Sequence, residues 1–76
     1  MATPAAQSLT PSRSTLALRI RVLRAIRGWS QETLGEAAGI HRTYISTIEQ
    51  AHCNVGLDTL DKLARAFNTT AAALLA

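Results

Sequence analysis

The chain has 76 residues, 47% of them hydrophobic. This length allows one small domain, and we expect no separate effector domain beside it. The single cysteine excludes a disulfide within the chain and fits a reducing, cytoplasmic compartment, and no apolar run approaches the ~20 residues that cross a bilayer. The formal net charge of +3 sets only a mild preference for nucleic acid or an anionic membrane surface as a partner.

The first segment, residues 1–14, is predicted to be a flexible N-terminal arm because it is rich in Ala, Ser, Thr and Pro. It lacks the charged start and the apolar middle of a secretion signal. The folded domain is therefore expected over residues 15–76.

The first helix is expected over residues 15–27. Ser14 or Thr15 can cap its start, and Gly28 should end it. A core stripe follows the i, i+4, i+7 rule at Leu16, Ile20 and Leu23. A second apolar stripe lies on the opposite side, at Leu18, Val22 and Ala25, with Ile26 at its margin.

A shorter helix is expected over residues 31–38. Ser30 is a good N-cap, and Glu32 lies favourably in the first turn. Gly39 should stop the helix, because only glycine takes a left-handed conformation at little cost. The inward face is assigned to Leu34, Ala37 and Ala38, and Ile40 is expected to hold the following turn in the core.

The next helix, residues 42–50, combines a narrow apolar stripe with a polar outer face. Ile45 and Ile48 should point inward. The 100° step per residue turns the other side chains outward, namely Thr43, Ser46, Thr47 and Gln50, with Arg42 at the N-terminal edge. Two short helices separated by a glycine, the second with a polar face, are typical of a helix that supports another helix lying in a DNA groove.

Residues 51–56 are predicted to be a loop, and a helix should follow over residues 57–67, with Asn68 acceptable after its end. Its buried stripe is expected at Leu60, Leu63, Ala64 and Phe67. Thr70 can cap a last short helix that contains Leu74 and Leu75. The predicted fold is all-α, a compact five-helix domain.

An ordered set of short motifs runs through these helices. It comprises Arg19-Ile20-Arg21, Leu23-Arg24, Arg27-Gly28-Trp29-Ser30-Gln31, Leu34, Ala38-Gly39-Ile40, Tyr44-Ile45-Ser46, Ile48-Glu49, Leu57-Asp58-Thr59-Leu60 and Leu63-Ala64. The set, which spans residues 16–75, resembles the helix-turn-helix family of phage lambda repressor and Cro, also called the XRE family. The resemblance implies a lambda-repressor-like DNA-binding domain.

A narrower resemblance is to the controller proteins of restriction-modification systems, on the run Arg42-Thr43-Tyr44-Ile45-Ser46, the loop residue Asn54 and the short length. The chain departs from the family pattern at three places. Ala51 stands where a glycine is usual, Val55-Gly56 where Pro-Ser is usual, and Gly35 where an alanine is usual. Gly35 should cost under ~1 kcal/mol of stability and keep the helix crossing close.

Arg42 is the first candidate for contact with a DNA base, because a guanidinium can donate two hydrogen bonds to guanine O6 and N7. The alternatives are a solvated arginine or a phosphate contact. Thr43, Ser46 and Thr47 are further candidates, since their hydroxyls can bond bases or phosphates and threonine methyls can pack on thymine methyls. For these three the alternative is a helix surface without function.

Phosphate contacts are expected from Gln31, His41, Tyr44 and Asn54. Gln31 begins a helix whose free N–H groups and positive dipole end favour an anion, and the resemblance implies the same role for it. The alternatives are a capping role for Gln31, packing alone for Tyr44, and turn formation for Asn54.

Arg24 and Glu49 fall on the edges of the inner stripes of their helices, and the resemblance implies that they form a structural ion pair within the domain. Losing one partner would leave an uncompensated charge and destabilise the fold. His41, His52 and Cys53 lack the paired short spacings of a four-ligand zinc site, so neither a metal nor a cofactor is expected.

The leading interpretation is a sequence-specific DNA-binding transcription regulator that binds a near-palindromic operator as a homodimer through the major groove. The resemblance places dimer contacts on the C-terminal helices, at Phe67, Leu74 and Leu75. The alternative is a protein-interaction module, antitoxin-like or a co-regulator, that binds a partner protein through Leu18, Val22 and Ile26, unless the arm covers this stripe with Leu9. An enzyme is disfavoured by the lack of a Ser/His/Asp set, paired acids or a Gly-rich phosphate loop.

Overall fold

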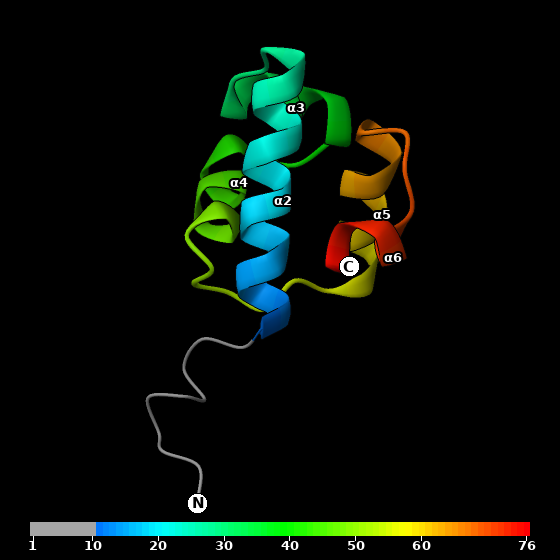
Figure 1. The fold of residues 1–76 in the computed structure, drawn as a ribbon. Helices are drawn as coiled ribbons and strands as arrows, with labels where there is room; N and C mark the ends of the chain where they lie inside the picture. The colour runs from blue at the N-terminus through cyan, green and yellow to red at the C-terminus, as the bar shows by residue number, and fades with distance from the viewer. Residues whose placement is uncertain (1–10) are drawn as a thin grey trace, which may run out of the picture.

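A computed structural model describes residues 11–76, which form helices and contain no strand (Figure 1). The helices in chain order are α2 (Pro11–Arg27), α3 (Gln31–Ala38), α4 (Arg42–Glu49), α5 (Leu57–Ala66) and α6 (Ala71–Leu75). The expected all-α, five-helix fold is confirmed over this range. None of these described helices is long and apolar enough to cross a membrane.

Helix α2 begins earlier than the sequence predicted, at Pro11 rather than near Ser14 or Thr15. Proline suits the first turn of a helix because its ring fixes φ at about −65° and it has no N–H to leave unpaired. Residues 11–14 of the expected arm are therefore helical, whereas residues 1–10 lie outside the described range. Gly28 follows the end of α2 with a φ of 66°, as expected for a glycine that terminates a helix.

The turn between α3 and α4 depends on two glycines. Gly39 ends α3 with a φ of 71°, a conformation that costs glycine little. Gly35 is buried, and a Cβ atom placed on it would lie 2.5 Å from the carbonyl oxygen of Ile40. A side chain at this position would therefore have to push the backbone of the turn away from α3.

The inward face of α3 differs from the prediction at one residue. Ala37 was assigned to the core, but it is exposed. Leu34, Gly35 and Ala38 are the buried residues of this helix. The assignment was wrong because the bare backbone of Gly35 brings its own side of α3 against the turn, and Ala37 is then rotated away from the core.

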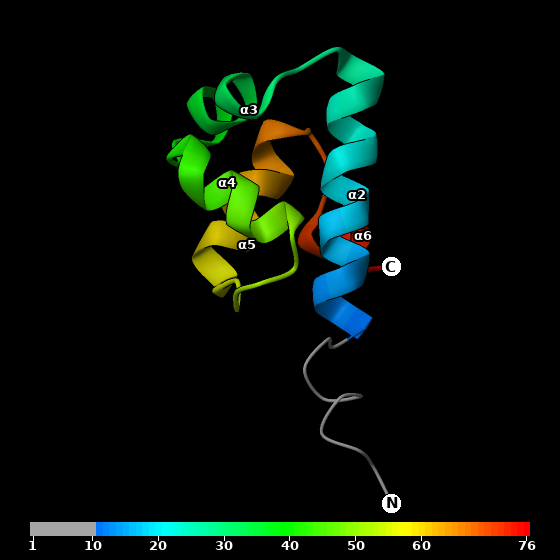
Figure 2. The ribbon, with the colours of Figure 1, turned by 90° about the vertical axis from the view of Figure 1, so that its left-hand side faces the viewer.

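The core lies between α2 and the other helices, and α2 packs against both α4 and α6 (Figures 1 and 2). Its fully buried large side chains are Ile20, Leu34, Ile45, Ile48, Leu63 and Leu74. At one end the rings of Trp29 and Phe67 stack with centroids 5.6 Å apart. The guanidinium of Arg27 lies over both rings and donates to the Phe67 carbonyl oxygen at 2.8 Å. These contacts hold α2 and α5 together.

Two of the residues expected at a dimer interface belong instead to the core of the chain itself. Phe67 is 2% exposed and Leu74 is fully buried, because α6 folds back onto α2 and α5. A dimer contact would need these side chains at the surface, so the expectation is corrected for both. Leu75 remains exposed.

Candidate nucleic-acid interface

Helix α4 stands at one face of the molecule, where it faces the viewer in Figure 2. Ile45 and Ile48 fix it from behind, since both are buried in the core. His41 caps its start, and the Nδ1 atom of this histidine accepts a hydrogen bond from the backbone N–H of Thr43 at 3.1 Å. The helix is thus held at both its inner side and its N-terminus, which leaves its polar side free.

The polar side carries the expected set of side chains. Arg42 and Thr43 are exposed, whereas Ser46 and Thr47 are half-buried. The Thr47 hydroxyl donates to the Thr43 carbonyl oxygen at 3.1 Å, so its hydrogen is already used within the helix. Thr47 therefore offers an acceptor oxygen and a methyl group to a ligand rather than a donor.

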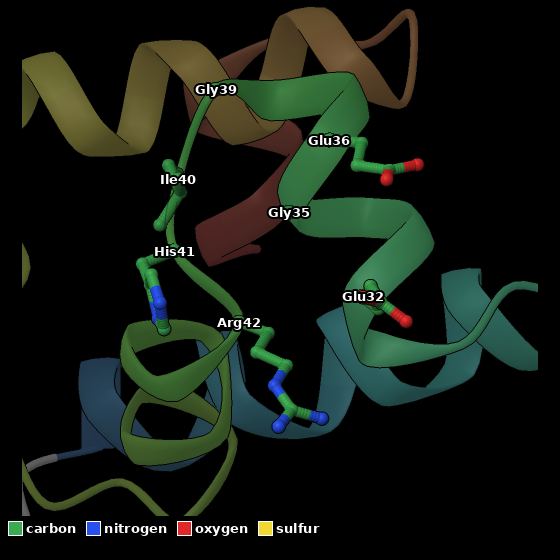
Figure 3. Close-up of a pocket in the computed structure, with 7 residues that line it drawn as sticks. All are labelled: Glu32, Gly35, Glu36, Gly39, Ile40, His41 and Arg42. Atoms are coloured by element: carbon green, nitrogen blue, oxygen red, sulfur yellow. The ribbon is translucent and has the colours of Figure 1, made fainter.

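Arg42 extends from the start of α4 into the space beside α3 (Figure 3). This space is a cleft of about 390 Å³, lined by Glu32, Gly35, Glu36, Gly39, Ile40, His41 and Arg42. The guanidinium makes no hydrogen bond or ion pair with any residue between 11 and 76, although Glu32 and Glu36 lie along the opposite wall. Its donors therefore remain available to a ligand.

The inner edge of α4 has the opposite character, because its one carboxylate is fully engaged. Glu49 is buried, and its two oxygens accept from the Arg24 Nε atom at 2.6 Å and the Nη2 atom at 2.8 Å. The Arg24 Nη1 atom donates to the carbonyl oxygen of Trp29 at 2.8 Å. The hydrogen bonds to Glu49 raise the pKa of the Arg24 guanidinium above its ordinary value. This is the ion pair expected from the sequence.

Gln31 lies in a different environment from the one predicted. Its side-chain amide donates to Glu49 Oε1 at 3.1 Å, and the residue is half-buried. The amide thus extends the Arg24–Glu49 pair instead of pointing away from the protein. The start of α3 is capped separately, by the Ser30 hydroxyl that accepts from the N–H of Thr33 at 3.0 Å.

The remaining phosphate candidates occupy three different settings. Tyr44 is half-buried and packs against the core. His41 is exposed at the start of α4, beside Arg42. Asn54 is exposed in the loop, where its side-chain oxygen accepts a hydrogen bond from Arg13 of α2. The structure therefore brings His41 and Tyr44 to α4 but ties Asn54 to the start of α2.

The loop after α4 contains two of the positions at which this sequence departs from the family pattern. Ala51 has a φ of 59°, a left-handed conformation that strains any residue with a side chain, so the usual glycine is explained. Gly56 caps α5 without a side-chain hydrogen bond. A serine at that place would supply one.

Sequence reasoning missed one exposed apolar residue. Leu57 begins α5 and is 79% exposed, although it lies one turn before the buried Leu60. The position of Leu57 at the extreme end of the stripe is the signal that could have indicated this exposure. Leu57 and Leu75 line one shallow groove, whose other members are Ser12, Arg13, Leu16, Asn54, Val55 and Leu60.

Within residues 11–76, no three His, Cys, Asp or Glu side chains come together in a way that could hold a metal ion. Cys53 is a free, half-exposed thiol.

Comparison with known proteins places this arrangement in a family. A helix-turn-helix family model matches residues 20–74. A hypothetical transcription factor of Neisseria meningitidis serogroup B is 40% identical over 63 residues, which cover 83% of this chain and 59% of that protein. Control protein C.SmaI of Serratia marcescens is 48% identical over 60 residues, which cover 79% of this chain and 71% of that protein.

A solved structure agrees with these sequence matches. The restriction-modification controller protein C.AhdI of Aeromonas hydrophila has a TM-score of 0.79 and 34% identity, over 86% of this chain and 98% of that chain. The matched range contains α3, α4 and the turn between them. These relatives are a hypothetical transcription factor and two control proteins. The chain therefore belongs to the helix-turn-helix (XRE) family of DNA-binding transcription regulators.

Proposed function

We propose that this protein is a sequence-specific regulator that binds a near-palindromic operator as a homodimer, with α4 of each copy in the major groove. The observation that carries the proposal is the contrast in charge on α4. Its exposed arginine, Arg42, has no partner within residues 11–76, whereas its carboxylate, Glu49, is buried and paired. An approaching phosphate backbone thus meets donors and no free carboxylate on this helix.

In this proposal the exposed side of α4 reads the bases. The Arg42 guanidinium donates to O6 and N7 of a guanine, a pairing worth ~1–3 kcal/mol of discrimination. Thr43 and Ser46 contribute hydroxyl contacts. Thr47 packs its methyl group on thymine or accepts from an adenine or cytosine amino group, because its own hydrogen is held by Thr43.

Phosphate contacts position the helix. The N–H groups in the first turn of α3, at Gln31, are well placed for a phosphate because the Ser30 hydroxyl takes only the N–H of Thr33. The side chain of Gln31 supports Glu49 instead. His41 and the Tyr44 hydroxyl add contacts at the two ends of the first turn of α4, and Asn54 adds its amide N–H₂ from the loop.

The homodimer is proposed to form through the groove that contains Leu57 and Leu75. Both are exposed leucines, and leucine and valine side chains form the floor between them. A two-fold pair of such surfaces would bury Leu57, the most exposed large apolar side chain among residues 11–76. Two copies of α4 would then enter successive major grooves about 34 Å apart.

Selection from random-sequence duplexes with the purified chain tests the function. The proposal expects enrichment of a two-fold symmetric sequence, with an affinity that falls steeply as salt rises. A selection at low salt that enriches no sequence would contradict it.

Sedimentation tests the dimer separately. Leu57→Lys should leave the chain monomeric at concentrations where the wild type dimerises. The matched control is Leu18→Lys, an equally drastic change of an exposed leucine on α2. Equal weakening by both substitutions would contradict the assigned surface.

A second candidate function rests on the outer stripe of α2. Leu18, Val22 and Ile26 are 56%, 43% and 73% exposed, so the described fold leaves this apolar stripe uncovered. An exposed apolar stripe can mark a protein interface. The candidate is a protein-interaction module whose association is insensitive to salt and is abolished by Ile26→Glu. If Ile26→Glu loses the partner but still binds the operator, the stripe acts in protein association and not in DNA recognition.

A further inference from the structure

We infer that a groove between α2 and the C-terminal end of α4, with Arg21 as its cation, binds a backbone phosphate of the same duplex that α4 reads. The inference rests on the proposed function and adds a contact that is independent of sequence. The contact lies near the C-terminal end of α4, whereas Arg42 lies at the N-terminal end.

The groove brings together segments that are distant in sequence. It has a volume of about 450 Å³, and its lining residues are Ser14, Ala17, Arg21, Glu49, Gln50, Ala51 and His52. The middle of α2 lies beside α4 in both views (Figures 1 and 2). The groove therefore opens next to the helix that is proposed to enter the DNA.

Arg21 carries the only uncompensated charge in this groove. It is exposed and makes no hydrogen bond or ion pair with residues 11–76. The other arginines of α2 are occupied: Arg13 with Asn54, Arg19 with the Ala76 carbonyl oxygen, Arg24 with Glu49, and Arg27 with the Phe67 carbonyl oxygen. The one carboxylate in the lining, Glu49, is 7% exposed and neutralised by Arg24. The groove is therefore positive.

The dimensions of α4 suit a cation at each end. Its eight residues span ~12 Å at 1.5 Å per residue. The major groove of DNA is about 12 Å wide and has a row of phosphates along each wall. Arg42 lies at the N-terminal end of α4, where it is proposed to read a base, and the groove with Arg21 lies at the C-terminal end, where a phosphate row would pass.

The chemistry of the lining favours phosphate over a base edge. Arg21 belongs to α2, which packs beside α4 and does not itself enter the DNA groove in the proposed function. Its neighbours Ser14, Gln50 and His52 are polar, are exposed and can donate hydrogen bonds. A charged phosphate oxygen is the acceptor that such a mixed set of donors binds without reading sequence.

The test measures binding of the wild-type chain and Arg21→Gln to the selected operator and to an unrelated duplex, over a range of salt concentrations. Arg21→Gln should weaken binding to both duplexes by the same factor, roughly 3- to 10-fold. It should also lower the slope of log affinity against log salt by about one per bound chain. Arg21→Lys should keep the slope. The matched control is Arg65→Gln on α5, another exposed arginine that has no partner within residues 11–76.

Two results would overturn the inference while leaving the proposed function intact. One is an unchanged affinity and salt slope in Arg21→Gln, and the other is a loss confined to the operator, which would mean a base contact. An unchanged urea midpoint in Arg21→Gln is expected, and a lowered midpoint would mark a structural role instead. A wild-type chain without any preferred sequence would overturn the proposed function and this inference together.

Discussion

The two sides of α4 treat charge in opposite ways. On the inner side, Arg24 gives all its guanidinium nitrogens to Glu49 and to the Trp29 carbonyl oxygen. On the outer side, Arg42 gives its nitrogens to no residue in the described part of the chain. The same residue type thus serves the fold in one place and is left for a ligand in the other.

The difference shows that the role of an arginine here depends on whether its donors are already bonded within the fold, since both arginines carry the same charge. A partly buried, fully bonded guanidinium cannot leave its partners without leaving a buried carboxylate uncompensated. An exposed guanidinium without partners adds almost nothing to stability and can be lost without harm to the fold. Substitutions on the two sides should therefore separate stability from binding.

Arg24→Met should have the largest effect on stability. It removes the partner of a buried carboxylate, and breaking such a pair typically costs about 3–5 kcal/mol, with the lower end expected because Arg24 is partly exposed (19% of its side chain). The free energy of unfolding from urea titration is the measurement. Arg21→Met, one turn earlier on α2, is the control and should change this free energy by less than ~0.5 kcal/mol. Equal losses of unfolding free energy in Arg24→Met and Arg21→Met would contradict a structural role specific to Arg24.

Arg42→Ala should have the reverse profile. Affinity for the selected operator should fall roughly 10- to 100-fold, as the loss of two hydrogen bonds to one guanine implies, whereas the unfolding free energy stays unchanged. Fluorescence anisotropy with operator and scrambled duplexes gives the affinities. A variant that binds the operator like the wild type would show that the outer side does not read the site through this arginine.

Gly35→Ala tests how the outer side is held in place. Helix propensity alone predicts that alanine stabilises α3 by up to ~1 kcal/mol. The structure predicts a loss of about 1–3 kcal/mol, because the new methyl group would meet the Ile40 carbonyl oxygen at 2.5 Å and the turn to α4 must open. Glu36→Ala, at the exposed neighbouring position, is the control. A gain of stability in Gly35→Ala would show that the turn adapts freely.

His41→Ala should have the smallest effect of the four. It removes the acceptor for the Thr43 N–H at the start of α4, a cap worth about 1 kcal/mol. His41→Asn should restore most of the loss, because asparagine is a good cap. Thermal unfolding resolves the two variants. If alanine and asparagine behave alike, the histidine does not act as a cap.

Much of the fold follows from local signals in the sequence. Gly28, Gly39, Ser30 and Thr70 mark helix ends that the structure confirms, since glycine and hydroxyl caps act through the backbone next to them. The start of α2 was predicted too late, because Pro11 was taken as part of the arm rather than as a first helical residue. Local signals therefore located the helices, and the start of α2 was the exception.

The features that the sequence did not reveal depend on contacts between distant segments. Phe67 and Leu74 were expected at a dimer surface, and only the return of α6 onto α2 shows that they are core. Gln31 has the sequence position of a phosphate contact, but its side chain is drawn to Glu49, a residue of the next helix. The free state of Arg42 and the groove beside Arg21 likewise depend on which side chains of other helices come near.

The central claim is that the exposed arginine of α4 reads a guanine, and a double-mutant cycle tests it directly. The operator is prepared with 7-deazaguanine, which lacks the N7 acceptor, at the contacted position. The account predicts that this change weakens binding of the wild-type chain several-fold but leaves binding of Arg42→Ala unaffected. An equal loss for both proteins would contradict the account, because the guanine would then be read by another residue.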